Sequence, residues 1–274
     1  MPALHRLAAP AKLTRSLAVT GRRGDGYHLL RAEMVAVDLA DELEIGEGDR
    51  LEVVDEVAWT GAAGGGIGHP PGGLPVAAGP DNLVARALAL AGRQAAVVLR
   101  KRIPAGAGLG GGSSDAAAVL RWAGVTDLDL AARLGADVPF CLVGGRAVVT
   151  GVGERLDPLP PLEEAYVVVT PPFGVSTAAV YGVFDEVGPG GGDGSNDLEL
   201  AACTAEPRLG RWRALLEGVA GRAPRLAGSG ASWFFPCGGD DEAATLRDDI
   251  GRAMAAEGER AALSSCKAVG PWAP

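Results

Sequence analysis

A glycine-rich segment at residues 103–115 constrains this chain more than any other feature. It reads Ile-Pro-Ala-Gly-Ala-Gly-Leu-Gly-Gly-Gly-Ser-Ser-Asp, with five glycines in the seven positions 106–112. A strand-like run at 95–99 precedes it, and a helix-like run at 116–120 follows it. Backbone without Cβ atoms folds tightly around an anion, and the N-terminus of the next helix adds free N–H groups and a positive dipole end. The segment therefore predicts a phosphate-binding loop.

Two common kinds of glycine loop fit this segment poorly. From residue 106 it matches Gly-x-Gly-x-x-Gly, the dinucleotide fingerprint, but that motif opens a βαβ unit with an acidic residue at the end of the next strand. The corresponding region, 127–129, reads as a turn and helix cap. A Walker A loop requires lysine before its hydroxyl residue, whereas Gly112 precedes Ser113. The first interpretation is disfavoured and the second excluded.

The charge balance limits the partners. The 274 residues carry a formal net charge of −9, which argues against binding to nucleic acid or to an anionic membrane. Basic residues gather in two places, around 12–23 and at 100–102. Each cluster is either a local anion pocket or a solvated face.

The cysteines and the hydropathy pattern indicate a reduced, cytoplasmic protein. Four cysteines lie far apart with no Cys-x-x-Cys pair, which disfavours a zinc site and a disulfide framework. The N-terminus lacks the apolar core of a signal peptide, and no apolar run reaches membrane-spanning length.

The remaining pattern predicts an α+β fold. Strands and helices mix without strict alternation, and Leu156 to Leu162 carries three prolines. We place a domain boundary there, giving domains at 1–157 and 158–274. A glycine- and proline-rich loop is expected at 61–79. Helix caps are expected at Asp81, at Ser113 or Ser114, and at Asp129. Strands are expected at 8–20, 29–40, 43–45, 51–54, 95–103, 148–150, 166–170, 233–236 and 261–269, and helices at 83–91, 115–122, 130–134, 176–184, 208–220 and 241–257.

The order of proline, glycine and serine at 104–117 resembles the ATP loop of the GHMP kinase superfamily. The resemblance implies that the loop and the next helix wrap the phosphates of ATP, with a serine hydroxyl near Mg²⁺. Ser114 is the candidate for the metal, with Ser113 as the alternative. The implied nucleotide-binding residues are Pro104, Gly106, Gly108, Leu109, Gly110, Gly111, Gly112, Ser113 and Ser114.

Further blocks narrow the resemblance. Residues 9–13 (Ala-Pro-Ala-Lys-Leu), 21–30 with its Asp-Gly-Tyr-His, and 135–140 (Gly-Ala-Asp-Val-Pro-Phe) resemble the 4-diphosphocytidyl-2-C-methyl-D-erythritol kinases. Weaker blocks extend the likeness to about residue 236. It implies an ATP- and Mg²⁺-dependent kinase that phosphorylates the 2-hydroxyl of that cytidylyl substrate in non-mevalonate isoprenoid synthesis. It also implies a domain like ribosomal protein S5 domain 2 followed by a ferredoxin-like domain, in a monomer or weak homodimer.

The same resemblance implies roles for individual residues. Asp137 would be the general base, and Lys12 would lie beside it, the acceptor hydroxyl and the γ-phosphate, because phosphoryl transfer needs a proton acceptor and a cation. The implied substrate-binding residues are Thr14, Tyr27, His28, Tyr181, Gly228, Ser229 and Gly230.

The chain departs from the family pattern at two neighbouring positions. Thr14 stands where the family has asparagine, and Arg15 stands where it has leucine. Threonine offers one hydroxyl in place of an amide donor and a carbonyl acceptor. Two alternatives therefore remain open: a GHMP-type kinase for a different small alcohol, and a non-catalytic nucleotide-binding paralogue.

Overall fold

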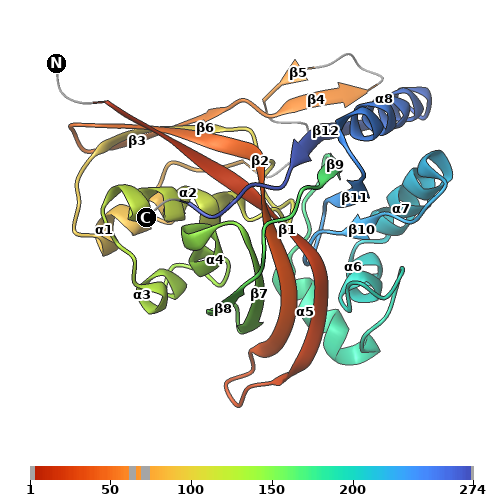
Figure 1. Cartoon of the computed structure of the whole chain (residues 1–274), viewed down its shortest axis with the longest axis horizontal. Helices are drawn as coiled ribbons and strands as arrows, with labels where there is room; N and C mark the ends of the chain where they lie inside the picture. Colours follow the sequence, from red (N-terminus) through yellow and green to blue (C-terminus); the bar gives the residue numbers. More distant parts are fainter. Residues whose placement is uncertain (1–3, 62–65, 69–74, 273–274) are drawn as a thin grey trace.

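Two mixed layers of sheet and helix make up the protein (Figure 1). The computed structural model describes residues 4–61, 66–68 and 75–272. Its first sheet has the order β3-β6-β2-β7-β8, with β1 paired to β2. These strands are β1 (His5–Arg22), β2 (His28–Gly46), β3 (Arg50–Asp55), β6 (Ala96–Lys101), β7 (Arg146–Gly151) and β8 (Arg155–Pro158).

The second sheet has the order β10-β11-β9-β12-β4-β5. Its strands are β4 (Ala58–Gly61), β5 (Gly66–Ile67), β9 (Ala165–Thr170), β10 (Arg225–Leu226), β11 (Trp233–Cys237) and β12 (Arg260–Lys267). β9 is buried along its whole length, from Ala165 to Thr170, as expected for a central strand.

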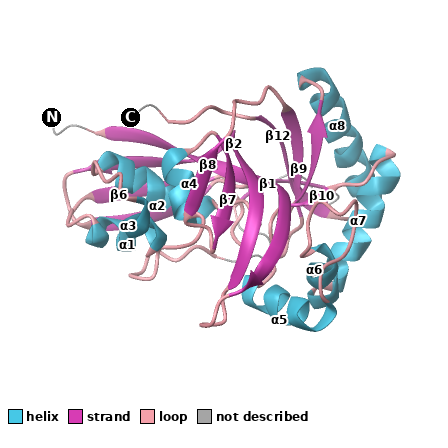
Figure 2. Ribbon diagram, turned by 60° about the horizontal axis from the view of Figure 1, so that its bottom comes forward, coloured by secondary structure: helices cyan, strands magenta, loops and turns pink. Residues whose placement is uncertain are grey.

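Helices cover both sheets, and the two groups lie at opposite ends of the molecule (Figure 2). The helices beside the first sheet are α1 (Leu83–Leu90), α2 (Gly111–Trp122), α3 (Leu128–Ala132) and α4 (Val138–Val143). Those beside the second are α5 (Thr177–Val187), α6 (Glu199–Ala205), α7 (Pro207–Ala220) and α8 (Asp240–Ala256). Within the described residues, no helix is long and apolar enough to cross a membrane.

A long antiparallel hairpin, β1–β2, is the largest element of the first sheet. Its pairing runs from His5 opposite Ile45 to Arg22 opposite His28, with register shifts near Pro10, Thr14 and Val19. The shifts let so long a hairpin bend, and Figure 1 shows it reaching from the first sheet to the lower end of the molecule. We expected two strands at 29–40 and 43–45; the structure has one, because the carboxylate of Asp41 is hydrogen-bonded within the fold.

The two halves share a buried core. Leu13 and Ile103 from the first half belong to the same apolar cluster as Tyr166 and Phe234 from the second. The chain passes to the second sheet between β8 and β9. The division at 157/158 stays a prediction, and β4–β5 lies in the second sheet although it precedes that boundary.

Several local expectations were wrong. α1 is capped by Asn82, whose side chain accepts from the N–H of Val84 at 2.8 Å, and not by Asp81. α3 is capped by Asp127, not Asp129, because the helix starts two residues earlier than expected. α4 and α6 were not predicted, since helices of six and seven residues give too little periodicity. The expected loop at 61–79 contains β5, and its residues 62–65 and 69–74 lie outside the described part of the chain.

Candidate active site

The glycine loop, 104–110, lies between β1 and a second glycine turn at 227–231. Gly108 and Gly110 have positive φ values of 76° and 69°. A Cβ on Gly108 would lie 2.6 Å from a carbonyl oxygen of the second turn, and one on Gly110 would lie 2.9 Å from Cγ of Lys12. Only glycine accepts both the backbone conformation and these approaches. The loop is therefore packed against both halves of the molecule.

Helix α2 starts where the loop ends. Its N-cap is Gly110 in the left-handed conformation, with no side-chain cap, so the expected serine cap was wrong. The first-turn N–H groups and the positive end of the helix dipole are left for an anion. The hydroxyl of Ser114 is fully buried and donates to the carbonyl of Pro10 at 2.7 Å. Ser113, by contrast, lines the two cavities, described below, that lie on either side of the loop.

Lys12 and Asp137 meet beside the loop. Nζ of Lys12 lies 3.5 Å from Oδ2 of Asp137 and donates to Oγ1 of Thr14 at 3.1 Å. Lys12 is only 4% exposed, whereas the side chain of Asp137 is 31% exposed. Asp137 occupies the N-cap position of α4 without making a side-chain cap bond, so its carboxylate is available to the cleft.

A cleft of about 850 Å³ opens over this pair. It lies between the glycine loop, the β1–β2 hairpin, α5 and the second glycine turn. The predicted site residues that line it are Lys12, Thr14, Tyr27, His28, Gly108, Gly110, Ser113, Asp137, Tyr181, Gly228 and Ser229. Residues distant in sequence thus converge on one cavity.

The two positions that depart from the family pattern face different surroundings. Thr14 lines the cleft and accepts a hydrogen bond from Lys12. Arg15 points elsewhere, because successive side chains of a strand alternate between faces. Its guanidinium pairs with Glu33 at 3.3 Å and with Glu164 at 3.0 Å. Arg15 therefore leaves the cleft unchanged, and only Thr14 alters it.

Aromatic rings gather at the outer end of the cleft. His28 stacks on Tyr181 with ring centroids 4.7 Å apart and an interplanar angle of 21°. Nε2 of His28 lies 2.7 Å from Oδ1 of Asp185. Tyr27 is 63% exposed, with the guanidinium of Arg23 over its ring at 5.5 Å. This end offers flat apolar surfaces and polar edges, which suit a heterocyclic base.

Asp185 was missed by the sequence reasoning. It lines the cleft and orients His28. The available signal was its position four residues after Tyr181, which puts both side chains on one face of α5.

Two further cavities lie on the other side of the glycine loop. One, of about 470 Å³, is lined by the loop, by the start of α2 and by Asn82. The other, of about 230 Å³, is mostly apolar, with Val57, Trp59 and Phe173 in its wall. Both share Pro104 and Ala105. We call the larger cavity the trough and the smaller one the apolar pocket; the two adjoin at these residues.

Lys101 joins the two ends of the glycine loop. Its buried ammonium contacts Asp41 and lies 2.7 Å from Oδ2 of Asp115. Asp41 also accepts from the backbone N–H groups of Arg102 at 2.5 Å and Ile103 at 2.8 Å. Burial raises the pKa of Asp115 to about 8, against the opposing effect of Lys101. The strand that leads into the loop, β6, and the helix that follows it, α2, are thus held by one ion cluster.

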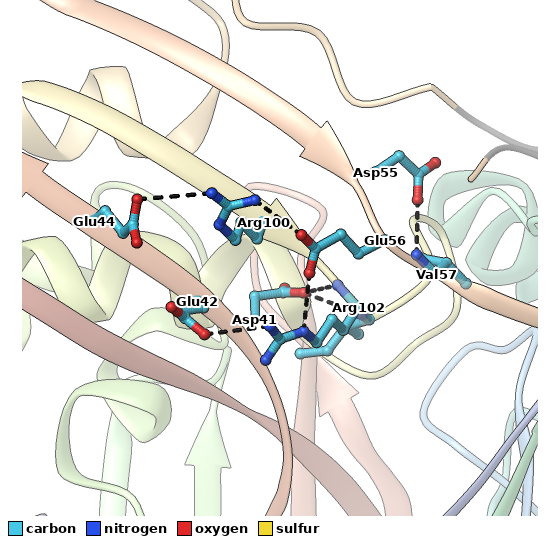
Figure 3. Close-up of polar contacts among 9 residues, drawn as sticks. Asp41, Glu42, Glu44, Asp55, Glu56, Val57, Arg100 and Arg102 are labelled. Atoms are coloured by element: carbon cyan, nitrogen blue, oxygen red, sulfur yellow. Dashed lines mark hydrogen bonds and ion pairs between the residues drawn. The ribbon is translucent and has the colours of Figure 1, made fainter. Parts of the chain in front are cut away.

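The basic cluster at 100–102 is structural. Arg100 pairs with Glu56 at 3.0 Å and Arg102 with Glu42 and Glu56, each at 3.2 Å, which Figure 3 shows around Asp41. These arginines lower the pKa of Glu56 through hydrogen bonds, the largest from Arg100. The cluster is therefore a network of ion pairs that braces β6, and its charge is already balanced by carboxylates.

The remaining predicted site residues divide into those that line the trough and two that line no part of the cleft or the trough. Pro104, Gly106, Leu109, Gly111 and Gly112 line the trough. Ser114 and Gly230 line neither the cleft nor the trough. The carbonyl of Gly230 instead lies behind the glycine loop, close to the space that a Cβ on Gly108 would fill.

Comparisons of the sequence and the fold with known proteins identify the family of this chain. The sequence model described as "GHMP kinases N terminal domain" matches residues 82–145. Among solved structures, a homoserine kinase from Cytophaga hutchinsonii superimposes with a TM-score of 0.62 at 15% identity, over 98% of this chain and 95% of its own. That likeness shows the fold. A 4-(cytidine 5'-diphospho)-2C-methyl-D-erythritol kinase superimposes with a TM-score of 0.72 at 33% identity, over 97% of this chain and all of its own.

The fold and the loop between its two sheets define a GHMP kinase, and the expected two-domain α+β class is confirmed. The 4-diphosphocytidyl-2-C-methyl-D-erythritol kinase of Paracoccus denitrificans (strain Pd 1222) is 40% identical over 272 residues, covering 90% of this chain and 93% of its own. That of Thiobacillus denitrificans (strain ATCC 25259 / T1) is 38% identical over 87% and 88% of the two chains. The chain belongs to the 4-diphosphocytidyl-2-C-methyl-D-erythritol kinase family.

Proposed function

We propose that the protein transfers the γ-phosphoryl group of ATP to the 2-hydroxyl of 4-diphosphocytidyl-2-C-methyl-D-erythritol. The observation that carries the proposal is the Lys12–Asp137 pair, 3.5 Å apart, between a phosphate-type glycine loop and an aromatic-ended cleft. Membership of the kinase family supports both the reaction class and the substrate.

ATP binds along the trough. The first turn of α2 and the backbone of the glycine loop face its phosphates, because both present N–H groups to an anion. The base enters the apolar pocket lined by Val57, Trp59 and Phe173. The γ-phosphate then reaches the point where trough and cleft meet, at Gly108, Gly110 and Ser113, which line both.

The acceptor hydroxyl of the substrate lies beside Lys12 and Asp137. Asp137 takes the proton of the hydroxyl as it attacks phosphorus, and the ammonium of Lys12 offsets the negative charge that develops on the transferred group. Lys12 is held for this role by its hydrogen bond to Thr14 and by the close packing of Gly110 against its stem. Positioning and electrostatics supply most of the catalysis in phosphoryl transfer.

The cytidylyl part of the substrate occupies the aromatic end. Tyr27 and Tyr181 offer stacking surfaces, and His28, held by Asp185, offers a hydrogen-bonding edge. Gly228 and Ser229 form the wall between this end and the catalytic pair, where the diphosphate of the substrate lies.

We also propose that Mg²⁺ enters with ATP. No group of three or more carboxylate, histidine or cysteine side chains in the described residues could hold an ion by itself. That fits Mg²⁺, which in kinases is held by one or two carboxylates together with substrate phosphates and water. Ser113 and Asp137, both at the cleft, are the side chains that would face it. When bound, the ion neutralises charge on the phosphates.

The test is an ADP-release assay with ATP, Mg²⁺ and the cytidylyl substrate, with the phosphorylated product identified by mass. We expect saturable turnover whose kcat falls ~10²- to 10⁴-fold in Asp137→Asn. ATP binding without turnover of this substrate, or faster turnover of another small alcohol, would overturn the proposal. Thr14 and Arg15 were the two sequence departures that favoured a different acceptor alcohol. Because the ion pairs of Arg15 lie outside the cleft, only Thr14 still favours one.

A further inference from the structure

The C-terminal tail, 268–272, leaves the second sheet and returns across the first half of the molecule. In Figure 1 the dark blue strand β12 continues as a coil towards the C label beside α2. The N–H of Val269 donates to the carbonyl of Ala36 at 2.9 Å, and that of Trp272 donates to the carbonyl of Val143 at 3.0 Å. The tail therefore ends on the last residue of α4.

The side chain of Trp272 is fitted to that helix end. Its Nε1 donates to the carbonyl of Cys141 at 2.9 Å. Gly144, which follows α4, has a positive φ of 71°, and a Cβ there would lie 2.6 Å from Nε1 of Trp272. The indole thus occupies space that only a glycine leaves open.

A second donor shares the carbonyl of Cys141. Nη1 of Arg121 donates to it at 2.7 Å, and the guanidinium lies 5.1 Å from the centroid of the Trp272 ring. The terminal carbonyls of a helix lack intrahelical partners, and a cation there is favoured by the helix dipole. Arg121 and Trp272 together satisfy the end of a six-residue helix that is too short to be stable by itself.

This cluster, which we call the tail clamp (Arg121, Trp272 and the carbonyl of Cys141), joins three elements of the candidate active site. Arg121 lies in the last turn of α2, the helix that starts at the glycine loop. Its Nη2 donates to the carbonyl of Ala8 at 3.2 Å, on the strand that carries Lys12. The helix whose end Arg121 caps, α4, has Asp137 as its N-cap residue.

We infer that Trp272 is a positioning residue, which holds α4 so that the carboxylate of Asp137 stays beside Lys12. The inference rests on the proposed function, in which this pair acts on the acceptor hydroxyl. Asp137 makes no cap bond of its own, so its place depends on the helix behind it. Displacement of a catalytic group by about 1 Å costs on the order of 100-fold in rate. The nucleotide trough does not include the tail, so loss of the clamp affects transfer and spares ATP binding.

The test compares Trp272→Ala and Trp272→Phe in the full chain, with Lys267→Ala as the matched control. Lys267 is the exposed last residue of β12, directly before the tail, and pairs with Asp240 outside the clamp. We expect kcat for the cytidylyl substrate to fall roughly 10- to 100-fold in Trp272→Ala, with the KM for ATP unchanged. Trp272→Phe keeps a ring against Arg121 but loses the N–H donor, so its kcat falls less. Lys267→Ala keeps the wild-type kcat.

The concentration of folded sites is counted by titration with a non-hydrolysable ATP analogue, and kcat is expressed per binding site. An unchanged kcat per site in Trp272→Ala would overturn the inference, as would a loss of activity that only follows the loss of ATP-binding sites. If Trp272→Ala does not fold, the same criteria apply to Trp272→Phe. Failure of the wild-type chain to use the cytidylyl substrate would overturn the proposed function before any variant is compared.

Discussion

The ammonium of Lys101 lies 2.7 Å from the carboxylate of Asp115, and both side chains are buried at opposite ends of the glycine loop. Asp41 contacts the same ammonium, so one cation faces two carboxyl groups. Burial by itself lowers the pKa of Lys101, but the two carboxyl groups outweigh this effect and raise that pKa above its ordinary value. Oδ1 of Asp115 has no hydrogen-bond partner among the described residues, and a neutral carboxyl group tolerates burial without a partner better than a charged one does.

This cluster predicts a pH dependence of stability. The pKa of Asp115 rises from 3.8 to about 8 on folding, so between about pH 4 and pH 8 the folded chain binds a proton that the unfolded chain has released. The contribution of Asp115 to the free energy of unfolding therefore falls as pH rises through this window. Asp115→Asn imitates the neutral acid, and we expect it to remove that slope.

Urea denaturation of both proteins at pH 5, 6, 7 and 8 measures the effect. The wild type and Asp115→Asn should differ least at the acid end, with the variant gaining in relative stability towards pH 8. Parallel curves for the two proteins would show that Asp115 does not take up the proton.

Replacement of the general base tests the chemistry. Asp137→Asn keeps the size of the side chain and removes the proton acceptor, so we expect kcat to fall ~10²- to 10⁴-fold. The affinity for an ATP analogue and the melting temperature should change little, because Asp137 makes no cap bond to α4. Steady-state kinetics with calorimetric titration of the analogue measure both, and a variant with near-normal kcat would remove Asp137 from its role.

Loss of the Tyr181 ring tests the cytidine end. Tyr181→Ala removes the surface that stacks on His28 at 4.7 Å. Stacking of a base on an aromatic ring is worth about 1–3 kcal/mol, so the KM for the cytidylyl substrate should rise roughly 5- to 150-fold. The KM for ATP should stay constant. Tyr181→Phe is the control, since it keeps the ring; equal effects on both substrates in Tyr181→Ala would move the residue out of the substrate pocket.

A pair of glycines tests the packing of the loop. Gly110 has a positive φ, and a Cβ there would lie 2.9 Å from the stem of Lys12. Gly110→Ala should therefore lower the melting temperature and the turnover together. Gly112 lies inside α2, where a Cβ would make an ordinary contact of 3.4 Å with Leu83, so Gly112→Ala should leave the melting temperature equal or higher, since alanine favours helix. Thermal unfolding followed by circular dichroism separates the two, and equal losses in both variants would contradict this view of the loop.

The glycine loop and the long strands could be predicted from sequence because their signals are local. Five closely spaced glycines, or a sustained run of apolar residues, carry the information within one segment. The pair of Lys12 and Asp137 was reached only through resemblance, since nothing in the spacing of two residues so far apart shows that they meet. The structure brings them to 3.5 Å through the β1 strand and the start of α4.

Other parts depend on contacts that no local pattern records. Asp41 reads as a turn residue in sequence, yet its carboxylate holds the N–H groups that open the glycine loop. Asp115 reads as a helix-start residue, yet it faces Lys101. Trp272 lies beyond the last predicted strand, 261–269, and nothing in the sequence around it indicates a partner. In each case the partner lies on another element, so the interaction depends on the three-dimensional fold.

The position of β4–β5 has a consequence for how a protein of this kind diversifies. Gly61 at the end of β4 pairs with Arg260 of β12, so a segment from early in the chain is part of the sheet built by its end. Exchange of everything before or after residue 157 with a relative would therefore replace one partner of the β4–β12 pair and one side of the tail clamp. A substitution in the cleft, such as threonine at position 14, leaves both of these contacts in place.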